Sequence, residues 1–273
     1  MEKEDIKKVV RREYGSIARQ AGSSCGCGSG CCGGGAEVGR SIGYSDQELA
    51  SVPAGANLGL GCGNPLALAS IREGETVLDL GSGAGFDCFL AAQRTGRTGR
   101  VIGVDMTPEM VERARENAAR HGIENVEFIP GEIDALPVED ASVDLVISNC
   151  VINLAHDKEQ VFREAFRVLK PGGRLMVSDI VVTAGLPAAL RDSVAGYVGC
   201  VSGAVEKDKY LEGMRKAGFA DITVHDERVF PIDCMAEDPA IRAILADPGR
   251  LGWKLEEVAE SVRSISVSAI RPA

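Results

Sequence analysis

The sequence predicts an α/β fold with a mainly parallel sheet that is covered by helices on both faces. Short apolar runs typical of strands alternate with helical patterns from Thr76 onward. A glycine-rich turn beginning at Gly81 joins the first of these strands to the helix that follows it. Several predicted strands end in a polar residue. Parallel sheets of this kind bind their ligands beyond the carboxyl ends of the strands, so these residues are candidate ligand contacts.

The first βαβ unit shows the pattern most clearly. A strand at Thr76–Leu80 leads into the loop 81–85, a helix begins at Phe86, and a second strand beginning at Arg100 ends in Asp105. This is the outline of a nucleotide-binding unit. The glycine spacing is G-x-G-x-G, and Phe86 occupies the place of a third fingerprint glycine. We therefore expect a bound ligand other than a pyrophosphate.

Asp79 lies two residues before this loop, and an acid there suits a cationic ligand better than a phosphate. S-adenosylmethionine (SAM) fits this requirement, because it carries an ammonium, a sulfonium and a ribose but no phosphate. Asp105 is placed to accept hydrogen bonds from ribose hydroxyls.

The rest of the chain continues the alternation. We expect helices at 107–121, 157–169 and 207–217, and strands at 125–130, 142–149, 174–180, 221–230 and 264–271. Thr107 is expected to cap its helix, Asn64-Pro65 to start a short helix, and Pro171-Gly172-Gly173 to form a turn. Residues 183–205 interrupt the pattern and predict an insertion of helices and loops over the carboxyl edge.

The chain of 273 residues is long enough for one α/β domain with additions. We divide it into an N-terminal helix with a Cys/Gly-rich segment (1–44), a central ligand-binding domain (45–182) and a C-terminal region with a lid and the final strands (183–273). A net charge of −10 without a basic stripe argues against nucleic-acid partners. No apolar run approaches the ~20 residues of a membrane span, and no signal-peptide core is present, so we expect a cytoplasmic protein.

Sulfur dominates the soft-ligand capacity of the chain, which has nine cysteines and three histidines. The odd cysteine count without an export signal argues against a disulfide framework. Cys25, Cys27, Cys31 and Cys32 lack the C-x₂-C spacing of zinc ribbons. Cys88 and Cys234 are interpreted as packing residues.

Several motifs together resemble class I SAM-dependent methyltransferases: the order Asp79-Leu-Gly81-Ser-Gly83-Ala-Gly85, then Asp105, the Gly131 turn and VFREAFRVLKPGGRLMVSD. This resemblance implies a Rossmann-like, seven-stranded, mainly parallel sheet with an N-terminal extension and an insertion before the last strands. It also implies a set of SAM-binding residues, namely Asp79, Gly81, Ser82, Gly83, Gly85, Asp105, Met106, Glu132, Ile133 and Asn149.

A narrower resemblance connects NLGLGCGNPLALASIREGETVLDLGSGAGFDCFLAA, SNCVINL and GYVGCVSGA to arsenite methyltransferases, which detoxify arsenic. It implies that Cys62, Cys150 and Cys200 hold As(III) as thiolates and that the arsenic lone pair attacks the methyl group of SAM. Thiolates suit this soft element, and no general base is required. The implied partners are arsenite or its thiol conjugates and a thiol reductant such as glutathione or thioredoxin. We expect a monomer.

The N-terminal cysteines at 25–32 allow two interpretations, arsenite capture or a redox-active tail in which Cys31 and Cys32 form an exchangeable disulfide. The whole protein also has two alternative functions. One is a carbon or oxygen methyltransferase for a small organic molecule, which would need no cysteine set. The other is a non-catalytic metalloid-binding protein, which would bind arsenite without methylating it.

Overall fold

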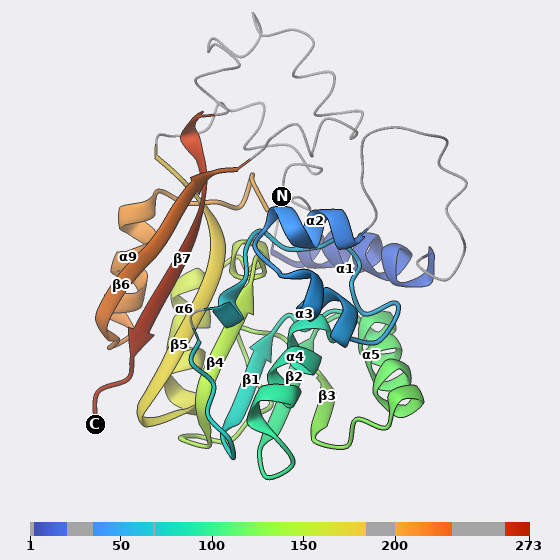
Figure 1. The fold of residues 1–273 in the computed structure, drawn as a ribbon. Coiled ribbons are helices and arrows are strands. Elements are labelled where there is room, and N and C mark those ends of the chain that lie inside the picture. The colour runs from blue at the N-terminus through green and yellow to red at the C-terminus, as the bar shows by residue number, and fades with distance from the viewer. Residues whose placement is uncertain (1–2, 21–34, 68, 184–199, 231–259) are drawn as a thin grey trace, which may run out of the picture.

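A seven-stranded sheet forms the centre of the computed structural model, which describes residues 3–20, 35–67, 69–183, 200–230 and 260–273 (Figure 1). The strand order is β3-β2-β1-β4-β5-β7-β6. The first five strands pair in parallel, and β7 runs antiparallel to both of its neighbours. The strands are β1 Thr76–Leu80, β2 Arg100–Asp105, β3 Val126–Pro130, β4 Val143–Asn149, β5 Leu169–Val182, β6 Ala220–Val229 and β7 Val262–Ile270. The predicted α/β fold is confirmed.

Helices cover both faces of the sheet. Alternate residues of one strand enter different cores: Val77 packs with the helices on one face, and Leu78 with those on the other. This double burial explains why the strands read as continuous apolar runs. The helices are α1 Lys3–Gln20, α2 Gly35–Ser41, α3 Asp46–Ser51, α4 Phe86–Thr95, α5 Pro108–His121, α6 Lys158–Val168 and α9 Lys207–Lys216, with the 3₁₀ turns η1 Pro65–Ala67 and η2 Ile152–Leu154.

The loop between β1 and α4 requires glycine because of its backbone conformation and because neighbouring side chains leave no space for a Cβ atom. Gly81 and Gly85 have φ angles of 70° and 95°, in the left-handed region that favours glycine. A Cβ atom at Gly85 would lie 2.8 Å from the rings of Phe89 and Phe128, and one at Gly81 would collide with Val151. The loop is therefore packed closely against α4, β3 and the segment that follows β4.

Three local expectations were wrong in detail. Thr107 occupies the N-cap position of α5, but its side chain accepts no capping hydrogen bond. Asn64-Pro65 begins a single 3₁₀ turn and not a full helix. Pro171 and Gly172 lie inside the long strand β5, where the register with β4 shifts after Val143. A shift of this kind lets a strand absorb a proline and a glycine without ending.

The N-terminal helix α1 lies across the carboxyl edge of the sheet, beside α2 in the right half of Figure 1. The Lys7 ammonium pairs with Glu132 and lies 3.3 Å from Asp134 Oδ2. Burial lowers the pKa of Lys7, but the hydrogen bonds and charges of Glu132 and Asp134 outweigh that effect and raise the pKa. At the other end of α1, Arg113 donates to the Ala18 carbonyl at 2.9 Å. These contacts hold α1 over the region where the ligand was predicted.

The C-terminal strands β6 and β7 belong to the same sheet as β1–β5, and the division at residues 44 and 182 remains a prediction. Cys25, Cys27, Cys31, Cys32 and Cys234 lie outside the described residues, as do 184–199 of the expected insertion. Among the helices that the structure describes, none is both long enough and apolar enough to cross a bilayer.

Candidate active site

A cavity of about 1350 Å³ opens at the carboxyl edge of the sheet, beneath α1. Pockets for a single small ligand are typically ~300–1,000 Å³. The volume is therefore sufficient for a cofactor and a small substrate together. The predicted cofactor residues that line it are Asp79, Gly81, Ser82, Gly83, Asp105, Met106, Glu132, Ile133 and Asn149. Gly85 is not among the lining residues.

Asp105 faces the glycine loop at the end of β2. Its carboxylate accepts hydrogen bonds from the Gly83 amide at 2.9 Å and the Thr107 amide at 2.8 Å. Burial raises the pKa of Asp105, and these two amides partly offset that effect. The Ser82 hydroxyl is buried beside the loop without a hydrogen-bond partner. A buried polar atom of this kind calls for a partner, and Ser82 lies on the cavity wall.

A second acid, Asp87 in the first turn of α4, was missed by the sequence analysis. The Tyr44 hydroxyl donates to Asp87 at 2.6 Å, and the Asn149 amide donates to it at 3.2 Å. Burial is the main cause that raises the pKa of Asp87, to about 6. Burial, and then the charge of Asp87, raise the pKa of Asp79 well above its usual range. Two neighbouring buried carboxylates favour a positively charged ligand between the loop and Tyr44.

Asn149 connects this acidic group to the loop that carries Cys62. Its side-chain oxygen accepts from the Cys62 amide at 3.1 Å, and its side-chain nitrogen donates to the Gly63 carbonyl at 2.9 Å. A role of Asn149 in cofactor binding stays a prediction. The geometry adds a second role, because the same side chain holds the Cys62 loop against the end of β4.

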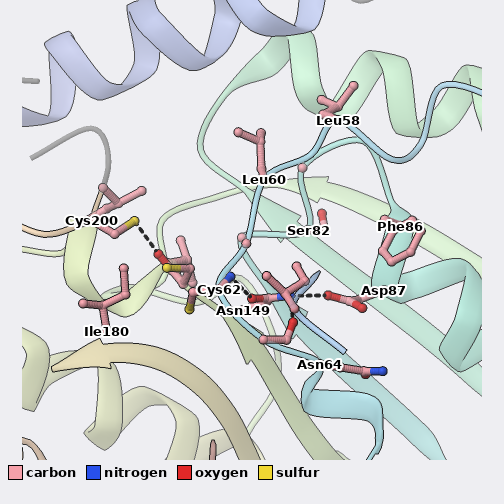
Figure 2. Close-up of a pocket in the computed structure, with 18 of the residues that line it drawn as sticks. Leu58, Leu60, Cys62, Asn64, Ser82, Phe86, Asp87, Asn149, Ile180 and Cys200 are labelled. Atoms are coloured by element: carbon pink, nitrogen blue, oxygen red, sulfur yellow. Dashed lines mark hydrogen bonds between the residues drawn. The ribbon is translucent and has the colours of Figure 1, made fainter. Parts of the chain in front are cut away.

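The three cysteines singled out in the sequence come together in this cavity. The sulfur atoms of Cys62 and Cys150 and a carboxylate oxygen of Asp179 all lie within 4.8 Å of one another. The Cys200 thiol donates to the Cys150 carbonyl at 2.8 Å. Figure 2 shows Cys62 and Cys200 at one end of the pocket, with Asn149 and Asp87 leading toward Phe86 at the other. The thiols and the cofactor loop therefore share one cavity.

Two of these cysteines have an unusual backbone conformation. Cys150 has φ 62° and Cys200 has φ 65°, in the left-handed region that residues other than glycine seldom adopt. The Cys150 amide is held by the Ser178 carbonyl at 2.8 Å, in the adjacent strand β5. Such conformations persist only where surrounding contacts enforce them, and they cluster at binding and catalytic sites.

Burial keeps the thiols neutral in this environment. It raises the pKa of Cys62. A hydrogen bond from Cys200 lowers the pKa of Cys150, but the Cys62 sulfur and burial together outweigh it and raise that pKa well above its usual value. The hydrogen bond to Cys150, with burial, raises the pKa of Cys200. A positive charge close to the sulfur atoms, such as the sulfonium of bound SAM, would lower these pKa values.

Asp179 and Tyr14 are further neighbours of the cysteines that sequence reasoning missed. Asp179 is fully buried in β5 and accepts from Asn153 at 2.7 Å and from Tyr210 at 3.0 Å. Burial raises the pKa of Asp179 to about 7. Tyr14 of α1 lines the cavity and forms a hydrogen bond with Cys200. The available signals were weak: an acid near the end of a strand, and a tyrosine in a helix far away in sequence.

Comparison with known proteins gives consistent results. A family model described as a methyltransferase domain matches residues 71–218. The arsenite methyltransferase of Halobacterium salinarum is 50% identical over 81% of this chain and 59% of its own length. That of Aquipseudomonas alcaligenes is 43% identical over 59% of this chain and 48% of its own. The chain therefore spans about half the length of these curated relatives.

A solved structure also matches, that of an arsenic(III) S-adenosylmethionine methyltransferase from Chlamydomonas reinhardtii. The identity is 34%, the TM-score is 0.62, and the match covers 86% of this chain and 73% of that one. Sequence and fold agree, and the chain belongs to the arsenite methyltransferases, within the class I SAM-dependent methyltransferases.

Proposed function

We propose that this chain transfers a methyl group from SAM to trivalent arsenic. The observation that carries the proposal is the convergence of Cys62, Cys150 and Cys200 in the cavity that the glycine loop lines. A methyltransferase acting on an organic molecule has no need of three thiols from distant parts of the chain. The curated relatives that are 50% and 43% identical to this chain are named arsenite methyltransferases, which supports the proposal.

The thiols can bind arsenic although their pKa values are raised. When arsenous acid exchanges its hydroxides for three thiols, each thiol proton leaves with a displaced hydroxide as water. The exchange is therefore neutral overall and does not require free thiolates beforehand. Three sulfur ligands leave the arsenic lone pair available as the nucleophile, and positioning supplies most of the rate.

The residues around the glycine loop fit the cofactor. The carboxylates of Asp79 and Asp87 suit its ammonium, Asp105 suits its ribose hydroxyls, and the loop backbone allows a close approach. Met106, Glu132 and Ile133 continue the same wall. SAM, when bound there, supplies an activated methyl group. The remaining assignments are also proposals: a thiol reductant such as glutathione or thioredoxin, arsenite or its thiol conjugates as substrate, capture by the cysteines at 25–32, and a cytoplasmic monomer.

The test is incubation of the reduced protein with SAM and arsenite, followed by chromatographic separation of the arsenic species. We expect methylated arsenicals from the wild type and from Cys234→Ser, a control thiol outside the predicted set. Cys62→Ser and Cys150→Ser should lose nearly all product while they retain SAM binding. Absence of any methylated arsenic from protein that binds SAM would refute the proposal. Arsenite binding without product would indicate the non-catalytic alternative.

A further inference from the structure

The group formed by Cys62, Cys150 and Asp179 differs from the set expected for arsenic. Its third member is a carboxylate, and Cys200 is not part of it. We propose that Cys62, Cys150 and Asp179 form a binding site for a thiophilic divalent cation, Zn²⁺ or Cd²⁺, which excludes arsenic. The fourth position of this site is left to a water molecule.

The geometry is close to that of a tetrahedral site. The three ligand atoms lie within 4.8 Å of one another, whereas zinc–sulfur bonds of ~2.3 Å place two sulfur ligands about 3.8 Å apart. Closing this difference needs a movement of at most about 1 Å, which rotation of the Cys62 and Cys150 side chains about χ1 can provide. The Cys62 thiol donates a long hydrogen bond to the Ser178 carbonyl, at 3.5 Å, and also interacts with the Cys150 and Ser264 side chains.

Asp179 is held as metal-binding carboxylates usually are. Asn153 and the Ile180 amide donate to one of its oxygens, at 2.7 and 2.9 Å, and Tyr210 donates to the other, at 3.0 Å. The oxygen bonded to Tyr210 keeps a further acceptor position, whereas the other oxygen already accepts two hydrogen bonds. Neighbours of this kind orient a ligating carboxylate and support its basicity.

Trivalent arsenic and a divalent cation require different numbers and types of ligands at this position. Trivalent arsenic takes three sulfur ligands and retains a lone pair, so it has no need of Asp179. A divalent cation takes four ligands and accepts oxygen with sulfur. The Cys200 thiol contacts the Cys150 carbonyl, the Cys150 sulfur and Tyr14, and it is not a member of this group. Cys62 and Cys150 would thus be ligands in both proposed sites. Cys200 would be a ligand of arsenic only, and Asp179 a ligand of the cation only.

The charge balance is favourable. Binding releases the two thiol protons to solvent, and any proton on Asp179 leaves with them. Two thiolates and a carboxylate then surround a dication, which leaves one net negative charge. The half-buried Lys158 offsets part of it, because its ammonium interacts with Asp179 and Cys200. The cation would inhibit methylation by occupying two arsenic ligands. That consequence rests on the proposed function, whereas the site itself does not.

The experiment titrates the reduced full-length chain with Cd²⁺. Cys25, Cys27, Cys31 and Cys32 are replaced by serine to remove competing thiols. Thiolate-to-cadmium charge-transfer absorption reports binding, and ¹¹³Cd NMR reports the ligand types. We expect one bound Cd²⁺ with the chemical shift of a two-sulfur site. Asp179→Asn should weaken Cd²⁺ binding about 10- to 100-fold, whereas As(III) binding should change by less than about threefold. The exposed Asp208→Asn is the matched control and should bind Cd²⁺ as the wild type does.

Thermal unfolding and SAM binding confirm that each variant is folded, and Cys62→Ser provides a second variant that should lose Cd²⁺. Unchanged Cd²⁺ affinity in Asp179→Asn, or a chemical shift typical of three or four sulfurs, would overturn the proposal. If Cd²⁺ binds with this dependence on Asp179 but no arsenic is methylated, the cation site stands and the proposed function falls. If arsenic is methylated but Cd²⁺ binding does not depend on Asp179, the cation site falls and the proposed function stands.

Discussion

Cys200 donates its thiol hydrogen to the backbone carbonyl of Cys150 at 2.8 Å, across 50 residues of sequence. Both residues are in the left-handed backbone region. The contact therefore joins two strained positions, each of which carries a sulfur of the proposed arsenic site. Each strained residue also carries a proposed arsenic ligand. Substitutions that all remove the sulfur but differ in backbone strain therefore test stability and arsenic binding separately.

Replacing Cys150 should separate these two properties. Cys150→Ser keeps a Cβ atom in the left-handed conformation, whereas Cys150→Gly removes it. We expect the glycine variant to have the higher free energy of unfolding of the two, by about 1 kcal/mol. Both variants should lose arsenite methylation by about 100-fold or more, because one ligand is missing. Urea unfolding and arsenic speciation measure the two effects. A glycine variant less stable than the serine variant would contradict the strain interpretation.

Asn149 is predicted to affect both halves of the cavity. Its side chain contacts Asp87 on the cofactor side and the Cys62 loop on the other side. Asn149→Ala should therefore weaken binding of SAM and of As(III), each by about 1–3 kcal/mol of lost and unpaired hydrogen bonds. Calorimetric titration with each ligand gives the two affinities. Gln93→Ala, which removes an exposed amide bonded to the Ser51 carbonyl, is the control. If only one ligand were affected, Asn149 would not link the two halves.

Asp179 should make stability depend on pH. Its pKa is raised to about 7 in the folded protein, mainly by burial, whereas an unfolded aspartate titrates near ~3.9. Between these values the unfolded chain releases the proton while the folded chain keeps it, so the free energy of unfolding falls as pH rises. The stability of Asp179→Asn relative to the wild type should therefore increase as the pH rises from about 4 to about 7. Urea unfolding across this range measures the difference. A constant difference would show that Asp179 does not titrate in this window.

Tyr14 is predicted to position Cys200. Its hydroxyl forms a hydrogen bond with that thiol, and its ring lies on the cavity wall. Tyr14→Phe keeps the ring and removes the hydroxyl, so As(III) binding should weaken by about 1 kcal/mol while SAM binding is retained. Titration with arsenite measures the As(III) affinity of Tyr14→Phe and of the parent protein, both with the cysteines at 25–32 replaced by serine. A matching loss of SAM affinity would instead indicate that α1 had moved.

Much of this protein was readable from its sequence. Hydrophobic periodicity and turn residues located the strands and most helices. Val77 and Leu78, for example, are both apolar because their strand is buried on both faces. The glycine loop and Asp105 followed from local backbone requirements. The resemblance of short segments pointed to Cys62, Cys150 and Cys200, and the structure places their side chains together.

Tertiary structure alone decided which other groups meet these residues. Tyr44 reaches Asp87 across 43 residues, and Tyr210 reaches Asp179 across 31. Such pairings depend on how the elements pack, and neither hydrophobic period nor turn chemistry encodes them. The same holds for α1, whose amphipathic pattern predicted a helix but not the cavity it covers. Local sequence determined the elements and the loop, because those depend on near neighbours. Long-range packing determined the acids and tyrosines around the thiols, because a buried polar group is defined by the partner that folding brings to it.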